Sequence, residues 1–372
     1  MKTPIVPFFI SHRGCPHRCI FCNQETIAGS KGDFPSAAEI REKVAAYRRS
    51  SGCRSVGVAF YGGSFTSIAY EDQVRLLEPL QELLSVGEVS SIRISTRPDS
   101  LDPATATFLS TSGVATVELG VQSLDDRVLA EAERGHSAED VEKAVSCLKD
   151  EGITVGLQLM PGLPGETEEL AVGSLSRALA LRPDFLRIYP TLVVAGTSLA
   201  RRYAEGGYHP LSLVEAVRLC KVLLHQALLA EVPVVRMGLQ PTDDLDRAGT
   251  ILAGPYHPAF RQLVEAELCF DLLEKLVLHH TGDKVPLTVT CSPSRIADVV
   301  GQKRANIRRL MTERGIRIGR VQGDSRLTLF ELIVEGTSGV QSGSIIKDLR
   351  YSADSHLSEI PDRKQKEENS HV

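Results

Sequence analysis

Short β-rich runs alternate with longer amphipathic stretches from residue 1 to about residue 250, and this alternation restricts the fold more than any other feature. Seven runs rich in valine and isoleucine are strand candidates: residues 4–10, 55–61, 91–96, 115–121, 154–160, 185–189 and 232–238. The intervening amphipathic stretches predict helices over residues 37–49, 71–84, 125–132, 138–150 and 167–181. Strands that alternate with helices form a parallel sheet covered by helices. We therefore expect an α/β domain over residues 1–250.

The rest of the chain divides into three parts. Residues 251–284 have helical apolar spacing and predict a helical connector, and residues 285–340 predict a small module in the order strand, helix, strand, strand. Residues 341–372 turn polar and charged, so we expect a disordered tail there.

Composition sets broad limits on function. The chain has 372 residues, 42% hydrophobic and 24% charged, with a net charge of −5. This charge does not predict a protein that binds nucleic acid over its whole surface or one that binds membranes. No apolar run approaches the roughly 20 residues that span a bilayer, and the N-terminus lacks the pattern of a signal peptide. We therefore expect a cytoplasmic protein with reduced thiols and no membrane partner.

Polar and glycine-rich clusters follow four of the predicted strands. They cover residues 61–64, 95–99, 120–123 and 158–165. Glycine, proline and aspartate are also ordinary turn residues, but four successive clusters are hard to explain by turns alone. Parallel barrels carry their chemistry at the carboxyl ends of their strands. The recurrence predicts one site assembled from several strands.

Three cysteines, Cys15, Cys19 and Cys22, follow the first predicted strand with the spacing Cys-x3-Cys-x2-Cys. Three thiolates at this spacing can ligate three irons of a 4Fe-4S cluster and leave the fourth iron open. Zinc is an alternative, because His12 or His17 could complete a tetrahedral site. A disulfide with one free thiol would need an oxidising compartment.

This spacing, with Phe21 before the last cysteine, resembles the signature of the radical S-adenosylmethionine (SAM) superfamily. Over residues 5–250 the resemblance is closest to the branch that holds the Elongator catalytic subunit and the oxygen-independent coproporphyrinogen oxidases. It implies a partial (β/α)6 barrel in which Cys15, Cys19 and Cys22 hold a 4Fe-4S cluster whose open iron binds SAM. It also implies reductive cleavage of SAM to a 5′-deoxyadenosyl radical, with an electron donor of the flavodoxin or ferredoxin type.

Several residues match positions that bind SAM in this superfamily. The resemblance assigns SAM contacts to Phe21, Gly62, Gly63, Ser95, Gln122, Arg134 and Gln158. Ser95 stands where relatives carry glutamate, and Gln158 where they carry aspartate or histidine. Arg134 suits the SAM carboxylate because a guanidinium binds carboxylates in a bidentate manner. Near the last strand, we take Arg236 and Gln240 as a candidate catalytic pair that faces the substrate.

The small module resembles a KH domain at Gly301-Gln302-Lys303-Arg304, although the second glycine of the Gly-x-x-Gly loop is replaced by Arg304. Residues 285–335 hold nine Lys or Arg against five Asp or Glu, a basic balance that suits a phosphate backbone. We expect Lys303, Arg304 and Arg308 to contact RNA, with transfer RNA as the leading substrate class. Small-molecule (tetrapyrrole-like) radical chemistry is one alternative, and a non-catalytic, metal-containing RNA-binding protein is another.

Overall fold

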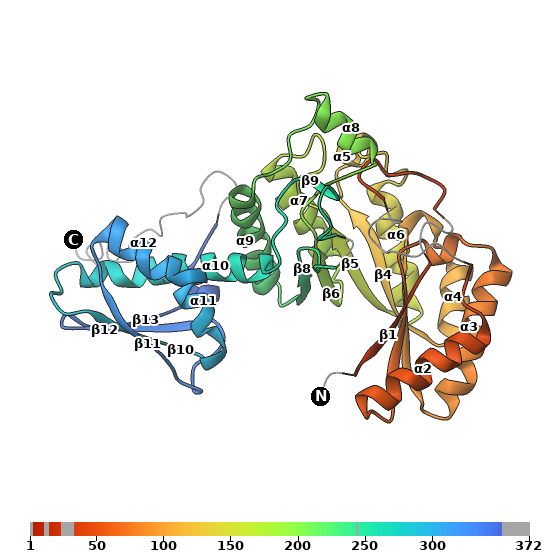
Figure 1. The fold of residues 1–372 in the computed structure, drawn as a ribbon, viewed down its shortest axis with the longest axis horizontal. Coiled ribbons are helices and arrows are strands. Elements are labelled where there is room, and N and C mark those ends of the chain that lie inside the picture. Colours follow the sequence, from red (N-terminus) through yellow and green to blue (C-terminus); the bar gives the residue numbers. More distant parts are fainter. Residues whose placement is uncertain (1–2, 11–14, 24–32, 243–244, 352–372) are drawn as a thin grey trace, which may run out of the picture. The chain divides into compact units, whose positions relative to one another are not determined.

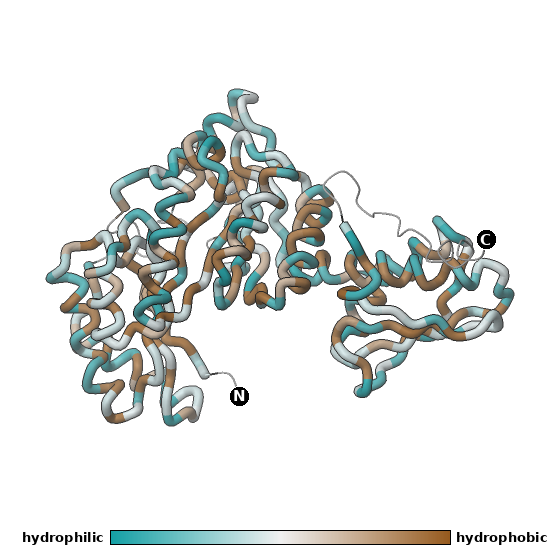
Figure 2. Tube along the Cα trace, turned by 180° about the vertical axis from the view of Figure 1, so that it is seen from behind, coloured by the Kyte–Doolittle hydropathy of each residue, from teal (hydrophilic) through white to brown (hydrophobic). Residues whose placement is uncertain are grey.

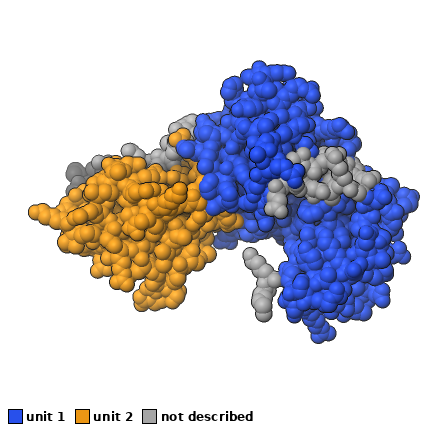
Figure 3. All heavy atoms as spheres, viewed as in Figure 1, with its two compact units in different colours: residues 1–216, 230–260 blue, residues 217–229, 261–372 orange. Residues whose placement is uncertain are grey.

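The structure is a computed structural model that describes residues 3–10, 15–23, 33–242 and 245–351. The chain divides into two compact units, and each is described by itself (Figure 3). Unit 1 comprises residues 1–216 and 230–260, and unit 2 comprises residues 217–229 and 261–372. The predicted tail beyond residue 351 lies outside the described residues.

Unit 1 is built on a seven-stranded sheet in the order β1-β2-β3-β4-β5-β6-β8, and every neighbouring pair in it is parallel. The strands are β1 (Ile5–Phe9), β2 (Val56–Tyr61), β3 (Val89–Thr96), β4 (Val114–Gln122), β5 (Thr154–Leu159), β6 (Phe185–Ile188) and β8 (Val234–Met237). They curl into a half-barrel with helices on its outer side (Figure 1). The α/β class and the partial barrel are thus confirmed, and the sheet holds one strand more than the six of the expected barrel.

The two faces of this sheet differ in chemistry because successive side chains point to opposite faces. Ile92 and Ile94 of β3 are fully buried and face the helical layer, whereas Arg93 and Ser95 lie on the inner face. The same alternation places Glu118 of β4 on the inner face. Figure 2 shows the apolar strands inside a more hydrophilic shell. The half-barrel therefore has an apolar outer layer and a polar interior.

The helices of unit 1 follow the strands in chain order. They are α2 (Ala37–Ser51), α3 (Tyr70–Ser85), α4 (Pro103–Thr111), α5 (Asp126–Glu131), α6 (Ala138–Asp150), α7 (Glu168–Ala180) and α8 (Ser198–Ala204). Local signals set their ends. Ser36 and Glu39 form a reciprocal capping box at the start of α2, and Gly52 ends that helix in the left-handed region. A two-stranded antiparallel sheet joins β7 (Val193–Val194) to β9 (Ile251–Ala253).

Unit 2 combines two long helices with a four-stranded sheet. Its elements are α9 (Leu213–Leu229) from residue 217 onward, α10 (Phe260–Val277) from residue 261 onward, β10 (Leu287–Cys291), α11 (Ile296–Val300), α12 (Ala305–Arg314), β11 (Ile318–Gly323), β12 (Glu331–Gly336), β13 (Gly339–Ser344) and α13 (Ile345–Asp348). The sheet order is β11-β10-β12-β13. Strand β10 is parallel to β11 and antiparallel to β12. The structure groups most of the predicted connector, through α10, with this unit.

Candidate functional site

The cysteine motif forms a loop directly after β1 that is anchored in the barrel. The backbone N–H of Cys22 donates to the carbonyl of Cys19 at 3.0 Å, so the last two cysteines share one turn. Ile20 between them is almost fully buried and packs with Val193 and Leu199. Its N–H donates to the carbonyl of Ala132 at 3.2 Å. A buried apolar residue between the thiols therefore fixes the loop against the protein.

Arg134 ties this loop to the carboxyl end of β4. Its Nη1 donates to Cys19 Sγ at 3.3 Å and its Nη2 donates to the carbonyl of Gly120 at 2.6 Å. A Cβ on Gly120 would lie 3.0 Å from both Arg134 Nη2 and Gln122 Nε2, so glycine makes room for both side chains. Arg97 Nη2 in turn donates to the carbonyl of Arg134 at 2.5 Å. The predicted SAM-carboxylate arginine thus lies directly beside a predicted cluster ligand.

Arg97 and Arg134 are the positive charges that influence the titratable groups near the cysteines. Arg97 forms a bidentate ion pair with Asp99 at 2.9 and 3.0 Å. Burial raises the pKa of the Cys15 thiol, and the guanidinium groups of Arg134 and Arg97 act in the opposite direction. Burial, followed by the charge of Arg134, lowers the pKa of His136 to about 3. His136 is therefore neutral, and its Nε2–H donates to the carbonyl of Val121 at 3.1 Å.

The residues around the cysteines suit an anionic ligand. Among the described residues, Arg97 Nη1, Arg134 Nε and His136 Nδ1 are buried without a hydrogen-bond partner. Two donors on guanidinium groups call for an anion, such as the carboxylate of a bound molecule. Nowhere in the described ranges do three His, Cys, Asp or Glu side chains gather tightly enough to hold a metal ion. Of the zinc alternatives, His12 lies outside these ranges, and the ring of His17 lies where a Cβ on Gly135 would be.

The other predicted SAM contacts lie at neighbouring strand ends. Gly62 and Gly63 directly follow β2, and Gly62 has φ 87°. Gln122 ends β4 with φ 70°, a left-handed conformation that costs a non-glycine residue free energy and recurs at functional sites. Gln158 Nε2 of β5 donates to Gln122 Oε1 at 3.2 Å. Ser95 lies on β3 opposite Glu118. The structure therefore brings these residues to adjacent strands, and their contacts to SAM stay a prediction.

Arg236 and Gln240 also lie together. Arg236 Nη1 on β8 donates to Gln240 Oε1 at 2.7 Å. Arg236 is the Cα partner of Arg187 on β6. The predicted pair thus lies on the last strand of the half-barrel, on the same face as a second arginine.

Sequence reasoning missed a buried ion-pair group inside the barrel. Glu118 Oε1 accepts from Arg93 Nη1 at 2.5 Å and from Arg187 Nη2 at 2.9 Å. Arg187 Nη1 also donates to the hydroxyl of Tyr189 at 3.3 Å, and its guanidinium lies 5.7 Å from the centre of the Tyr61 ring. Arg93, Glu118 and Arg187 are far apart in the sequence and carry no motif. Only the inward alternation of each strand could have suggested them.

Glu166 was missed as well. It follows the glycine-proline string 161–165, and its Oε2 accepts from the N–H of Gly162 at 2.7 Å. Burial raises the pKa of Glu166 from 4.5 to about 7, although the hydrogen bonds from Gly162 and Ser123 act in the opposite direction. The carbonyl of Gly162 accepts from the hydroxyl of Tyr208 at 2.6 Å. A carboxyl group whose pKa is about 7 therefore follows directly after the predicted strand-end cluster 158–165.

In unit 2, the predicted RNA loop lies between α11 and α12. Lys303 (φ 50°, ψ 30°) and Arg304 (φ 63°, ψ 32°) both adopt left-handed backbone conformations. Arg304 thus has the kind of backbone conformation that a second loop glycine would adopt freely. A Cβ on Gly301 would lie 3.0 Å from Asn306, so the first glycine allows close packing. The side chains of Lys303, Arg304 and Arg308 are exposed.

The basic balance of this module is smaller than the sequence count indicated. Three of its arginines form ion pairs with glutamates of α10: Arg295 with Glu265, Arg309 with Glu267 and Arg314 with Glu274. The count over residues 285–335 left out these acids because it stopped before α10. Within the part of the chain that the structure describes, Lys303, Arg304 and Arg308 form no ion pair. The exposed basic side chains of the module without an ion pair among the described residues are therefore Lys303, Arg304 and Arg308 at the loop, and Arg317 and Arg320 at β11.

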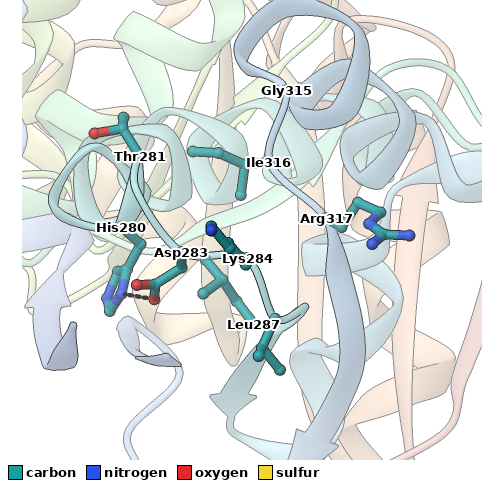
Figure 4. A pocket seen from close by; sticks show the side chains of 9 residues that line it. His280, Thr281, Asp283, Lys284, Leu287, Gly315, Ile316 and Arg317 are labelled. Carbon is teal, nitrogen blue, oxygen red and sulfur yellow. Dashed lines mark hydrogen bonds and ion pairs between the residues drawn. The ribbon is translucent and has the colours of Figure 1, made fainter. Parts of the chain in front are cut away.

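A small pocket in unit 2 lies between His280 and Arg317, far along the chain from the cysteine motif (Figure 4). His280 Nδ1 and Asp283 Oδ2 are 3.0 Å apart at one side of it. Asp283 also accepts from the hydroxyls of Thr337 and Ser338, at 2.6 Å from Thr337. Its carboxylate is therefore occupied in holding the turn between β12 and β13, and the pocket adds no residue to the site.

Two family models match the chain. The model of the radical SAM superfamily matches residues 9–176, and the model of the radical SAM C-terminal domain matches residues 183–269. The first range contains all three cysteines and every predicted SAM contact, and the second contains Arg236 and Gln240.

Curated relatives resemble the same part of the chain. The tRNA uridine(34) acetyltransferase of Methanocaldococcus infernus is 28% identical over 253 residues, which cover 57% of this chain and 47% of that protein. The protein of the same name from Dehalococcoides mccartyi is 32% identical, with 53% and 50% covered. Human Elongator complex protein 3 is 34% identical over 139 residues, with 36% and 25% covered. The chain spans about half the length of the first two relatives.

A solved structure shares the fold. The archaeal Methanocaldococcus infernus Elp3 with an N-terminal deletion superposes with a TM-score of 0.57 at 24% identity and covers 73% of this chain and 63% of that one. In the described part of this chain, no helix is long and apolar enough to cross a membrane.

Proposed function

The chain belongs to the radical SAM superfamily through residues 9–176 and 183–269, and on that basis we propose an enzyme that cleaves SAM reductively and acts on RNA. Cys15, Cys19 and Cys22 would hold the 4Fe-4S cluster that this superfamily uses. When bound, the cluster would supply the reductive cleavage of SAM and with it the removal of a hydrogen atom from the substrate.

The residues near the cysteines have different roles in the proposed reaction. Arg134 donates to Cys19 Sγ and stabilises negative charge on the thiolate, while its buried Nε is available to a bound carboxylate. Arg97 holds the backbone of Arg134 and thereby fixes its direction. Gln122 and Gln158 present a joined pair of amide groups beside it. Neutral His136 adds no further positive charge.

The reaction needs one electron from outside the chain, and a donor of the flavodoxin or ferredoxin type fits that need. The half-buried thiols of Cys15 and Cys22 must stay reduced to bind iron. A reducing compartment such as the cytoplasm keeps thiols in that state.

The loop of unit 2 supports RNA as the substrate class. Lys303 and Arg304 sit in strained left-handed conformations at the start of α12, and neither forms an ion pair among the described residues. Exposed basic side chains at a helix start suit a phosphate backbone. The relatives named as tRNA uridine(34) acetyltransferases favour transfer RNA within that class.

The carrying observation is the contact between Arg134 and Cys19 within a matched radical SAM domain. The test uses the full chain, reconstituted anaerobically with iron and sulfide, and measures 5′-deoxyadenosine with SAM and dithionite. Total transfer RNA should increase the yield, and the same RNA after nuclease digestion should not.

Two variants locate the RNA effect. Lys303→Gln combined with Arg304→Gln should abolish the increase, whereas Arg326→Gln, which removes an 88% exposed arginine, should keep it. If intact and digested RNA give equal yields, small-molecule radical chemistry replaces the RNA assignment. If the wild-type chain with a full cluster forms no 5′-deoxyadenosine at all, the hypothesis of a non-catalytic RNA-binding protein replaces both enzymatic hypotheses.

A further inference from the structure

The inner face of the half-barrel carries two arginines side by side. Arg187 of β6 and Arg236 of β8 are Cα partners on neighbouring parallel strands, so their side chains leave the sheet on the same face. Like charges at adjacent positions of a sheet destabilise it. Other groups must therefore offset the electrostatic repulsion between these two guanidinium groups.

The surrounding residues neutralise the positive charge of these arginines only in part. A single carboxylate, Glu118, serves both Arg93 and Arg187 through the same oxygen, Oε1. Arg236 donates to the neutral amide oxygen of Gln240 instead. Glu118 is the only acid among the described residues that line this face on β3, β4, β5, β6 and β8, against three arginines, so two positive charges are left over.

One guanidinium atom in this group also lacks a partner. Arg187 Nε is buried, and no described residue accepts its hydrogen bond. The Arg187 side chain is 19% exposed, so its surplus charge is only weakly hydrated. Buried charges in proteins are normally paired. An anion placed between Arg187 and Arg236 would satisfy the Nε donor and the surplus charge together.

Two tyrosines add neutral donors at the same place. Burial raises the pKa of Tyr61 and of Tyr189 above the usual value, so both keep their hydroxyl protons. The charges of Arg187 and Arg236 both act on the pKa of Tyr189 in the opposite direction, and Arg187 Nη1 donates to the Tyr189 hydroxyl at 3.3 Å. A tyrosine hydroxyl can donate to an oxyanion and accept from an arginine.

This group adjoins the predicted SAM contacts. Gln158 is the Cα partner of Arg187 on the next strand, and Gln158 Nε2 donates to Gln122 Oε1. The floor below is closed by the Phe185 ring, which lies where a Cβ on Gly156 would be. An anion held by the arginines would therefore lie inside the barrel, on the strand next to the one that carries Gln158.

We propose that Arg187 and Arg236 form an oxyanion site inside the barrel that binds a phosphate or carboxylate group of the substrate. The position of this site relative to SAM rests on the proposed function, whereas the anion binding itself does not. Two guanidinium groups side by side offer parallel N–H donors, the arrangement that suits both kinds of oxyanion. Arg93 and Glu118 act as positioning residues that hold Arg187 in place.

The test measures the thermal unfolding of the full chain in inorganic phosphate, acetate and chloride at equal ionic strength. In wild type, phosphate or acetate should raise Tm above the chloride value by about 4 °C when saturating. A rise with phosphate alone identifies a phosphate group, a rise with acetate alone identifies a carboxylate, and a rise with both leaves either oxyanion as the ligand. No rise with either would overturn the proposal.

Variants assign the response to this site. Arg236→Gln should lose the rise, and its Tm in chloride should not fall below that of wild type because a like-charge contact is removed. Arg236→Lys, which keeps the charge, should retain a smaller rise. Arg127→Gln, at an 80% exposed arginine of α5, should respond as wild type does.

Two outcomes contradict the assignment. A full response in Arg236→Gln would place the anion elsewhere, and a lower Tm of that variant in chloride would mean that the arginines do not repel each other. Because the assay involves no cleavage of SAM, its failure would leave the proposed radical chemistry untouched. Failure of SAM cleavage would likewise leave the anion site standing.

Discussion

Glu166 makes the stability of the barrel depend on pH in a direction opposite to that of most carboxyl groups. Burial raises its pKa from 4.5 to about 7, so folding favours the protonated form. This contribution to stability is complete below pH 4.5 and is lost as pH rises through about 7. A shift of this size corresponds to roughly 3 kcal/mol between the two limits. The variant Glu166→Gln keeps an oxygen for the N–H of Gly162 and carries no charge at any pH.

The assay compares urea unfolding of wild type and Glu166→Gln at pH 5 and pH 8. The two proteins should have similar free energies of unfolding at pH 5, and the variant should be more stable at pH 8 by about 2–3 kcal/mol. Glu169→Gln is the matched control, because this exposed carboxyl group has a lowered pKa set by its hydrogen bond with Thr167. That control should gain nothing at pH 8. Equal differences between wild type and Glu166→Gln at both pH values would refute the reasoning.

Three further substitutions test other parts of the account. Arg304→Gly should raise the free energy of unfolding by about 1 kcal/mol, because glycine adopts the left-handed backbone conformation without strain. The same variant should bind RNA more weakly in a filter assay. Unchanged RNA affinity would show that the charge of Arg304 does not contribute to RNA binding. Lys221→Ala should lower the free energy of unfolding in urea by about 3–5 kcal/mol, because it removes the ion-pair partner that lies 2.6 Å from the buried Asp271 carboxylate. The double variant Lys221→Met with Asp271→Leu should recover most of this loss of stability. A loss below about 0.5 kcal/mol in the single variant would contradict the prediction. Gly156→Ala should cost about 2 kcal/mol, since its Cβ would lie 2.2 Å from the Phe185 ring, and an unchanged urea midpoint would show that the ring moves aside freely.

The seven strands of the barrel were predictable because each is a short run rich in apolar residues that ends in glycine, proline or polar residues. The observed β3 (Val89–Thr96) and β5 (Thr154–Leu159) fall within two residues of the expected bounds. The helix over 138–150 was expected with the bounds that the structure shows. Local patterns were sufficient here because each element carries its own periodicity and its own caps.

The inner face of the barrel was not predictable in the same way. Arg93, Glu118 and Arg187 meet only because strand register brings positions from β3, β4 and β6 together. The raised pKa of Glu166 depends on burial, which the residues beside it in the sequence do not reveal. Properties that arise from three-dimensional juxtaposition leave no signal in one sequence.

The net charge of the small module also depends on contacts between residues that are distant in the sequence. Counting residues 285–335 predicted a basic module, but α10 supplies Glu265, Glu267 and Glu274 to three of its arginines. Residues 301–304 lie between α11 and α12, and their contact with RNA stays a prediction. The left-handed conformation of Arg304 could not be expected, since arginine rarely adopts it.

The central claim is that the three cysteines support reductive cleavage of SAM, and one measurement tests it directly. Wild type, Cys19→Ala and Cys53→Ala are reconstituted anaerobically with iron and sulfide, incubated with SAM and dithionite, and assayed for iron content and 5′-deoxyadenosine. The account predicts product from wild type and from Cys53→Ala, whose cysteine lies outside the motif, and none from Cys19→Ala. Equal product from all three proteins, or none from a wild-type chain with a full cluster, would contradict it.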